Sequence, residues 1–258
     1  MPRFAANLSL MFNEVPFLDR FEAAARAGFE AVEFLFPYDH PPEAVAERLR
    51  ANGLTQALFN MPPGDFAGGE RGLAALPARF DEVKAGVDTA LRYAEATGVK
   101  RLHLMAGLAD PTDQRARDAY RRSVIHAAER LAPAGLDLVL EPINTRNMPG
   151  YFLNDFGTAA ALIGELGLPN VKLQFDLYHC QILHGDVTMR LRAMMPLVGH
   201  VQTASVPDRH EPGTGEMDDA FLFAELDRLG YDGFVGCEYI PAGNTQAGLT
   251  WFAPYRRA

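Results

Sequence analysis

Four short apolar stretches of this sequence each end in a side chain that carries an oxygen atom suited to metal binding or proton transfer. The clearest is 138–141, an apolar run that ends in the carboxylate of Glu141 and is followed at once by a proline. Asp176, Gln202 and Glu238 end the other three. A charged group at the end of a buried strand is costly unless it has a partner. The repetition at four places indicates a shared partner.

A divalent cation is the partner that these side chains suit best. Three carboxylates brought together would repel one another without a cation between them. Carboxylate and amide oxygens are ligands for hard ions such as Mg²⁺ or Mn²⁺ rather than for zinc. Any one of these side chains could equally cap a helix or pair with an arginine, but four in register favour a site. We therefore expect a metal site formed by Glu141, Asp176, Gln202 and Glu238.

Three further side chains are candidates for contact with a substrate. His179 lies three residues beyond Asp176, and His103 lies near the end of a predicted strand. Arg209 belongs to the polar, glycine-rich segment 207–216. Its planar guanidinium would suit a substrate carboxylate. The competing interpretations are buried structural histidines and an exposed, solvated turn.

Other polar residues in or beside the predicted strands have simpler interpretations. Glu33 ends a predicted strand and could orient a neighbouring side chain. His200 lies on the same side of its strand as Gln202 but one layer deeper, so it is predicted to fill the interior. Cys180 and Cys237 have no visible base partner and are predicted to be small core residues.

Alternating strands and helices must position these residues. Strands are predicted at 4–10, 31–34, 54–59, 101–105, 136–141, 171–176, 198–203 and 234–238, with helical periodicity between them. This alternation predicts parallel strands covered on both faces. Eight units in 258 residues predict a single-domain (β/α)₈ TIM barrel over 1–258, with its active site at the C-terminal strand ends. A doubly wound open sheet is the competitor, but no GxGxxG follows the first strand.

The long segment 61–77 is predicted to be a functional loop.

Composition limits the classes of partner and the compartment. A net charge of −9 disfavours nucleic acid, because phosphate binding depends on clustered Lys and Arg. Two distant cysteines suggest a reducing compartment. Neither a signal peptide nor an apolar run that could span a membrane is visible. We expect a cytoplasmic enzyme that acts on a small molecule, without a nucleic-acid or membrane partner; the sequence leaves open whether it is a homo-oligomer.

Several motifs of the chain match a known family. They are the segments RFAANLS (3–9), VEFLFPY (32–38), GERG (69–72), EPIN (141–144), DRHEPGTGE (208–216) and GCEY (236–239). On these the sequence resembles the hydroxypyruvate isomerase family, within the xylose isomerase-like barrel superfamily, essentially from end to end. The last two motifs are the most specific.

The resemblance implies an aldose–ketose type isomerisation that interconverts hydroxypyruvate and tartronate semialdehyde (2-hydroxy-3-oxopropanoate) through a metal-stabilised enediolate. Glu141 and Glu238 match the acid/base glutamates of the family. Asp176 and Gln202 match metal-binding positions, and the two glutamates complete that set. His179 and Arg209 resemble residues that contact substrate oxygens in related ketose epimerases.

Four alternatives follow from the same resemblance or the same fold. A 2-oxo-tetronate isomerase would share the chemistry and differ in pocket length, which residues of the 61–77 loop would set. A ketose 3-epimerase is disfavoured, because Gln202 stands where those enzymes carry a histidine ligand and Asn147 stands near a further glutamate of theirs. A DNA-repair endonuclease would need more histidine ligands and a basic groove. A non-catalytic sugar-binding module would not need both glutamates.

Overall fold

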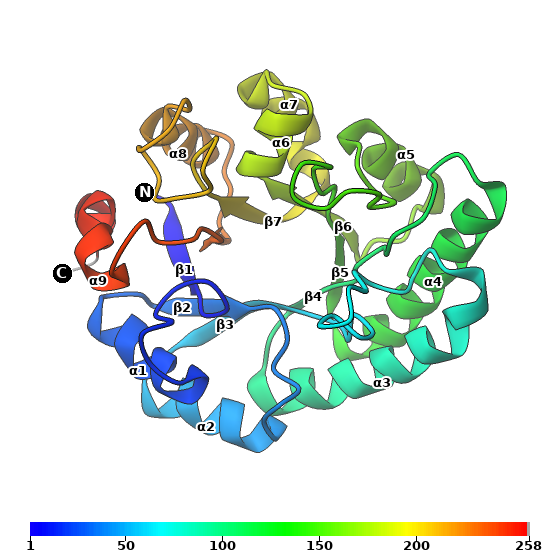
Figure 1. Ribbon diagram of the computed structural model, residues 1–258, viewed down its shortest axis with the longest axis horizontal. Coiled ribbons are helices and arrows are strands. Elements are labelled where there is room, and N and C mark those ends of the chain that lie inside the picture. The colour runs from blue at the N-terminus through cyan, green and yellow to red at the C-terminus, as the bar shows by residue number, and fades with distance from the viewer. Residues whose placement is uncertain (257–258) are drawn as a thin grey trace.

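The computed structural model describes residues 1–256, and in that range eight parallel strands form a closed barrel inside a ring of helices (Figure 1). Each strand pairs with the next along the chain, and β8 pairs with β1 to close the barrel. The predicted (β/α)₈ barrel is therefore confirmed. The strands are β1 (Arg3–Asn7), β2 (Ala31–Phe34), β3 (Thr55–Asn60), β4 (Arg101–His103), β5 (Asp137–Leu140), β6 (Val171–Asp176), β7 (Val198–Thr203) and β8 (Phe234–Cys237).

Helices connect successive strands on the outside of the barrel. They are α1 (Phe17–Arg26), α2 (Pro42–Ala51), α3 (Phe80–Thr97), α4 (Gln114–Leu131), α5 (Phe156–Leu166), α6 (Leu177–Leu183), α7 (Val187–Met194), α8 (Asp219–Arg228) and α9 (Thr245–Gly248). The sequence pattern did not predict α6 and α9. With seven and four residues, they are too short for helical periodicity to be visible. None of the helices in 1–256 is long and apolar enough to cross a membrane.

Several predicted strands are shorter in the structure, at their C-terminal ends. The first strand ends at Asn7 and the fourth at His103, because the chain beyond each leaves the ladder of its neighbours. After β4, Ala106 instead bridges Gly72 of the long 61–77 loop. Gly72 has a φ of +104°, and a Cβ there would overlap the Met105 backbone, so the loop can approach only with glycine at this position. The loop is thereby fixed to the C-terminal face of the barrel.

The interior of the barrel changes from apolar to polar along its axis. Near the N-terminal ends of the strands, Ala5, Ala31 and Ala57 pack together with Phe234. Two residues further along β1 and β2, on the same side of each strand, stand Asn7 and Glu33, both buried. The polar layer that begins there lies directly beneath the C-terminal rim.

Candidate active site

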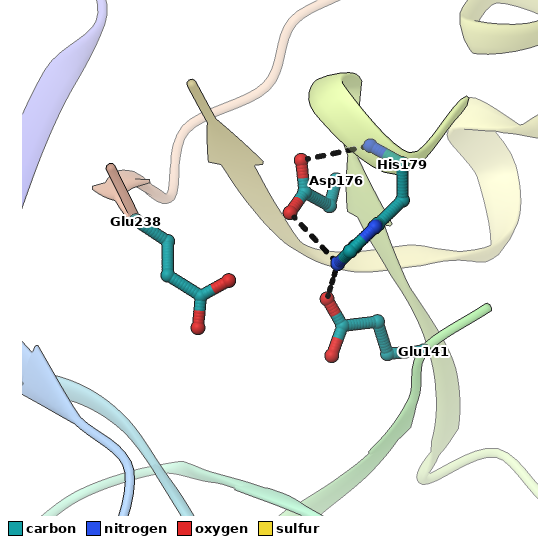
Figure 2. A group of neighbouring side chains, drawn as sticks. All are labelled: Glu141, Asp176, His179 and Glu238. Carbon is teal, nitrogen blue, oxygen red and sulfur yellow. Dashed lines mark hydrogen bonds and ion pairs between the residues drawn. The ribbon is translucent and has the colours of Figure 1, made fainter. Parts of the chain in front are cut away.

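Four titratable side chains converge at the C-terminal rim of the barrel: Glu141, Asp176, His179 and Glu238 (Figure 2). Each contributes one atom that could bind a metal ion, and these atoms all lie within 4.8 Å of one another. All four residues are buried. Figure 2 shows Glu238 facing the other three from across the barrel mouth.

The local sequence determines how the carboxylates enter this site. Pro142 follows Glu141 and has no N–H for further strand pairing, so β5 ends at Leu140, directly before the glutamate. Asp176 ends β6 and caps α6, where its Oδ1 accepts hydrogen bonds from the backbone N–H groups of Tyr178 (2.7 Å) and His179 (3.4 Å). Its Oδ2 and the Oε1 of Glu141 are buried without a hydrogen-bond partner among residues 1–256.

Burial disfavours the charged forms of these carboxylates. It raises the pKa of Glu238 to about 8 and that of Asp176 to about 6, although Arg209 opposes both shifts. It also raises the pKa of Glu141 well above its ordinary value, and the charges of Glu238 and Asp176 add to that effect. Three carboxylates facing a single guanidinium leave an excess of negative charge. The cluster, with two carboxylate oxygens that accept no hydrogen bond from residues 1–256, therefore fits a divalent cation.

Gln202, the fourth predicted ligand, lies opposite Asp176 on the neighbouring strand. Its amide nitrogen donates to Glu33 Oε1 at 2.7 Å, and its Oε1 accepts from Gln174 Nε2 at 2.5 Å. A carbonyl oxygen has two lone pairs, so this oxygen keeps one position for another partner. The predicted role of Gln202 as an oxygen ligand beside Asp176 stays a prediction.

The hydrogen bonds of His179 determine which ring nitrogen carries its proton. The backbone N–H of Asn144 donates to Nδ1 at 3.3 Å, and the side-chain amide nitrogen of the same residue lies 2.6 Å away. Because a backbone N–H can only donate, Nδ1 is unprotonated. Burial lowers the pKa of His179 well below 6.5, which makes the ring neutral and leaves its proton on Nε2. That Nε2 lies 3.6 Å from Asp176 Oδ2 and 3.7 Å from Glu141 Oε1.

A short chain of side chains holds Asn144 in this orientation. The backbone N–H of Asn147 donates to Asn144 Oδ1 at 2.9 Å, which turns the Asn144 amide nitrogen toward His179. Asn147 Oδ1 in turn accepts from Asn144 Nδ2 and from the hydroxyl of Tyr178. His179 thus presents an N–H to the site instead of a lone pair. This N–H favours a role for His179 as a hydrogen-bond donor and not as a further metal ligand, in keeping with the role predicted from the sequence.

Arg209 reaches the cluster from the loop after β7. Its backbone has a φ of +58°, and its Nη2 pairs with Glu238 and lies 3.9 Å from Asp176 Oδ2. The Arg209 Nε is buried and has no hydrogen-bond partner in the described part of the chain. A donor therefore remains for an anionic substrate group.

The loop that carries Arg209 is tied to the segment after β8. The backbone N–H of Ile240 donates to the Arg209 carbonyl at 2.8 Å. The buried Glu211 carboxylate accepts from the backbone N–H of Ala242 at 3.2 Å. These bonds hold the guanidinium next to Glu238.

His103 lies deeper, beside Glu141. Its Nδ1 is 3.6 Å from Glu141 Oε2, and neither ring nitrogen has a hydrogen-bond partner within residues 1–256. Burial, with a smaller effect of His200, lowers the pKa of His103 to about 3, so the ring is neutral. It contacts a site carboxylate, while its predicted contact with substrate stays a prediction.

The structure thus brings Glu141, Asp176, His179, Glu238 and Arg209 together at the rim, with Gln202 beside Asp176 and His103 deeper beside Glu141. It adds three residues that the sequence interpretation missed: Gln174, Asn144 and Asn147. Gln174 could have been found, because it lies two residues before Asp176 and therefore on the same side of its strand. The two asparagines lie in a loop with no periodic pattern, and only the fold brings them to His179.

Comparisons with known proteins agree with this geometry. The family model of the xylose isomerase-like TIM barrel matches residues 21–255. The chain is 54% identical over 257 residues to the 2-oxo-tetronate isomerase of Cupriavidus necator, with 99% of each chain covered. It is 42% identical to the hydroxypyruvate isomerase of Escherichia coli, covering 99% of this chain and 100% of that one.

A solved structure extends the similarity to three dimensions. The structure titled AP endonuclease, family 2, from Brucella melitensis superposes with a TM-score of 0.97 at 53% identity, with 100% of each chain covered. The chain therefore belongs to the xylose isomerase-like TIM barrel family, in the group of isomerases that includes the hydroxypyruvate and 2-oxo-tetronate isomerases.

Proposed function

We propose that this protein is a hydroxypyruvate isomerase, which interconverts hydroxypyruvate and tartronate semialdehyde with the help of a divalent cation. The observation that carries the proposal is the pair Glu141 and Glu238, which face each other across a buried site. Full-length similarity to the Escherichia coli hydroxypyruvate isomerase supports the same reaction.

The cation would be held by Glu141, Asp176, Gln202 and Glu238. Their oxygen atoms suit Mg²⁺ or Mn²⁺, and the unpartnered oxygens of Glu141 and Asp176 are the natural first ligands. When bound, a divalent cation acts as a Lewis acid that stabilises negative charge developing on substrate oxygens.

The two glutamates supply the proton transfer between adjacent substrate carbons. One glutamate, as the carboxylate, removes the proton bound to C3 of hydroxypyruvate to give an enediolate, and the other, as the carboxylic acid, donates a proton to C2. The proton of the C3 hydroxyl passes to the C2 oxygen, so that C3 becomes the aldehyde, and proton exchange with solvent restores the two glutamates. General acid–base steps of this kind contribute about 10²–10⁴-fold each. Holding the substrate between two carboxylates supplies the orientation.

His179 and Arg209 would orient the substrate. The Nε2–H of His179 points into the cluster and can donate to a substrate oxygen. The unpartnered Nε of Arg209 can donate to the substrate carboxylate while Nη2 stays on Glu238. The rim therefore offers a positive charge for the carboxylate of the substrate and two glutamates for its reacting carbons.

The second candidate is isomerisation of 2-oxo-tetronate, a longer acid with the same ends. The 54% identity to the Cupriavidus necator enzyme of that name favours it. Both reactions would use the same glutamates, and we propose that the 61–77 loop, fixed through Gly72, sets the pocket length that separates them.

We place this reaction in the cytoplasm, without a nucleic-acid partner. The net charge of −9 disfavours binding to phosphates. Cys180 and Cys237 are free and buried, in keeping with a reducing compartment.

Incubation of the purified protein with hydroxypyruvate and, separately, with 2-oxo-tetronate tests the proposal. Tartronate semialdehyde should form from the first substrate, and formation should stop with a chelator and resume with added Mn²⁺ or Mg²⁺. Turnover of 2-oxo-tetronate at a kcat/KM more than tenfold higher would establish the second candidate. Failure to convert either acid with metal present would refute both.

A further inference from the structure

We propose that Glu33 is a positioning residue that orients Gln202 so that its carbonyl oxygen faces the metal site. The inference rests on the proposed metal-dependent function. Glu33 belongs to β2, and its carboxylate reaches across the interior of the barrel to two side chains of β7. It belongs to the buried polar layer beneath the rim and is not one of the four residues of the cluster.

Three side-chain nitrogen atoms lie within hydrogen-bond distance of the Glu33 carboxylate in the buried polar layer. Asn7 Nδ2 lies 3.0 Å from Oε1, Gln202 Nε2 lies 2.7 Å from the same oxygen, and His200 Nε2 lies 2.7 Å from Oε2. Glu33, Asn7, His200 and Gln202 are all at most 1% exposed. Bulk water therefore does not compete for these contacts, and the orientation of each group is set by its neighbours.

An ionised carboxylate can accept hydrogen bonds but cannot donate them, and this determines which end of the Gln202 amide faces Glu33. Only the NH₂ end of the amide satisfies the contact at 2.7 Å. The carbonyl oxygen must then point away from Glu33. On that side it meets Gln174 Nε2 and lies level with Asp176 on the adjacent strand.

The surrounding chain keeps the carboxylate of Glu33 in place. Gly236 of β8 faces it, and a Cβ at that position would overlap the carboxylate group. The backbone of Gly236 has no positive φ, so space for Glu33, and not backbone conformation, requires glycine there. Asn7 supports the same oxygen that Gln202 contacts.

Glu33→Gln tests this arrangement because it keeps the size of the side chain and removes its acceptor-only character. A glutamine at position 33 can satisfy Gln202 in either orientation, so the Gln202 oxygen loses its fixed direction. Changes to residues that orient metal ligands typically lower metal affinity about 10–100-fold. We expect a loss of this size for Mn²⁺ in the absence of substrate.

The measurement is a Mn²⁺ titration of the full-length protein by calorimetry or electron paramagnetic resonance, with circular dichroism to confirm folding. Glu225→Gln is the matched control, because Glu225 is an equally buried carboxylate of α8 that contacts two arginines away from the site. Its Mn²⁺ affinity should stay within about threefold of wild type. If the wild type binds Mn²⁺ and Glu33→Gln binds it with the same affinity, the positioning role of Glu33 is overturned and the proposed metal-dependent function is not. Failure of the wild type to bind Mn²⁺ overturns both this inference and the metal-dependent function.

Two further variants separate orientation from charge, since Glu33→Gln also removes a negative charge near the cation. In a Gln202→Ala background, Glu33→Gln should cost little additional affinity, because the residue through which it acts is gone. An equal loss in both backgrounds would show a purely electrostatic effect and refute the positioning role. Gly236→Ala displaces the Glu33 carboxylate without changing any charge, and it should also weaken Mn²⁺ binding. It provides the test if Glu33→Gln does not fold, and wild-type affinity in Gly236→Ala would then overturn the inference.

Discussion

Two regions of this protein bury carboxylates in opposite ways. On α8, Glu225 receives hydrogen bonds from Arg192 Nε at 2.6 Å and Arg228 Nε at 2.7 Å, and these two arginines lower its pKa to about 2. At the barrel rim, burial raises the pKa of Glu238 to about 8 in spite of Arg209. The Glu225 carboxylate has its partners within the protein, whereas the rim carboxylates have too few.

The difference shows that burial alone does not distinguish a structural carboxylate from a carboxylate of a candidate site. Glu225 and Glu141 are both nearly inaccessible, at 2% and 4% exposed. Both oxygens of Glu225 are hydrogen bonded, so its ionised form is stable where it stands. Glu141 keeps an oxygen without a hydrogen-bond partner among residues 1–256, and its neighbours Glu238 and Asp176 repel its charge. Shortage of partners, with an excess of negative charge, is what makes the rim a candidate site for a cation.

The largest expected effect contrasts the two regions directly. Glu141→Gln and Glu238→Gln should each lower kcat by at least about 10²–10⁴-fold, because each removes a group that transfers a proton. Glu225→Gln should retain near-normal turnover. Steady-state kinetics on hydroxypyruvate, with circular dichroism of each variant, provide the measurement. Near-normal activity in either rim variant would eliminate the two-glutamate mechanism.

A smaller effect is expected from a change of His179. The variant tests whether this histidine donates a hydrogen bond to the substrate or binds the metal ion. His179→Gln should lower kcat/KM about 10–100-fold, the scale of a lost hydrogen bond to a charged or developing negative group. Mn²⁺ affinity should change by less than about threefold, since the Nε2 of His179 carries a proton. A drop in Mn²⁺ affinity as large as that of Asp176→Asn would instead make His179 a ligand.

The pH dependence of stability should differ between the chelated and the Mn²⁺-loaded protein. The folded-state pKa values of Glu238 (about 8) and Asp176 (about 6) lie above their ordinary values of 4.5 and 3.8. The folded, metal-free protein therefore binds more protons than the unfolded chain, and its stability should rise as the pH falls from 8 toward 6. Each kcal/mol gained would raise the melting temperature by about 2–4 °C. The Mn²⁺-loaded protein should lack this rise. The measurement is the melting temperature of each form as a function of pH, and the same pH dependence in both forms would contradict the assignment of the rim carboxylates as metal ligands.

The smallest effect is expected at Glu225, where the pH dependence of stability has the opposite sign. Its folded-state pKa of about 2 lies below the ordinary 4.5, so its contribution is complete above pH 4.5 and is lost as the pH falls toward 2. Glu225→Gln should flatten this part of the stability curve and leave the pH 6–8 region unchanged. Urea unfolding at several pH values between 2 and 5 measures the difference. An identical acid limb in the variant would show that the arginine contacts of Glu225 do not persist in solution.

Much of the fold was predictable because strand and helix alternate so regularly. The bounds of β2, β6 and β7 agree with the prediction. The helix α6 was not predicted, because its start depends on Asp176 acting as a cap rather than on a repeating pattern.

The sequence by itself determined which carboxylates and amides lie at or directly beside the C-terminal ends of the strands, and therefore which of them approach one another at that end of a closed barrel. Only the tertiary structure decided which atom each of them presents there. The oxygen of Gln202 points away from Glu33 because Glu33, distant in sequence, accepts a hydrogen bond from the Gln202 amide nitrogen. The N–H of His179 faces the cluster because Asn144 occupies its other nitrogen. The direction of a hydrogen bond depends on the partner across the barrel, and strand periodicity carries no information about that partner.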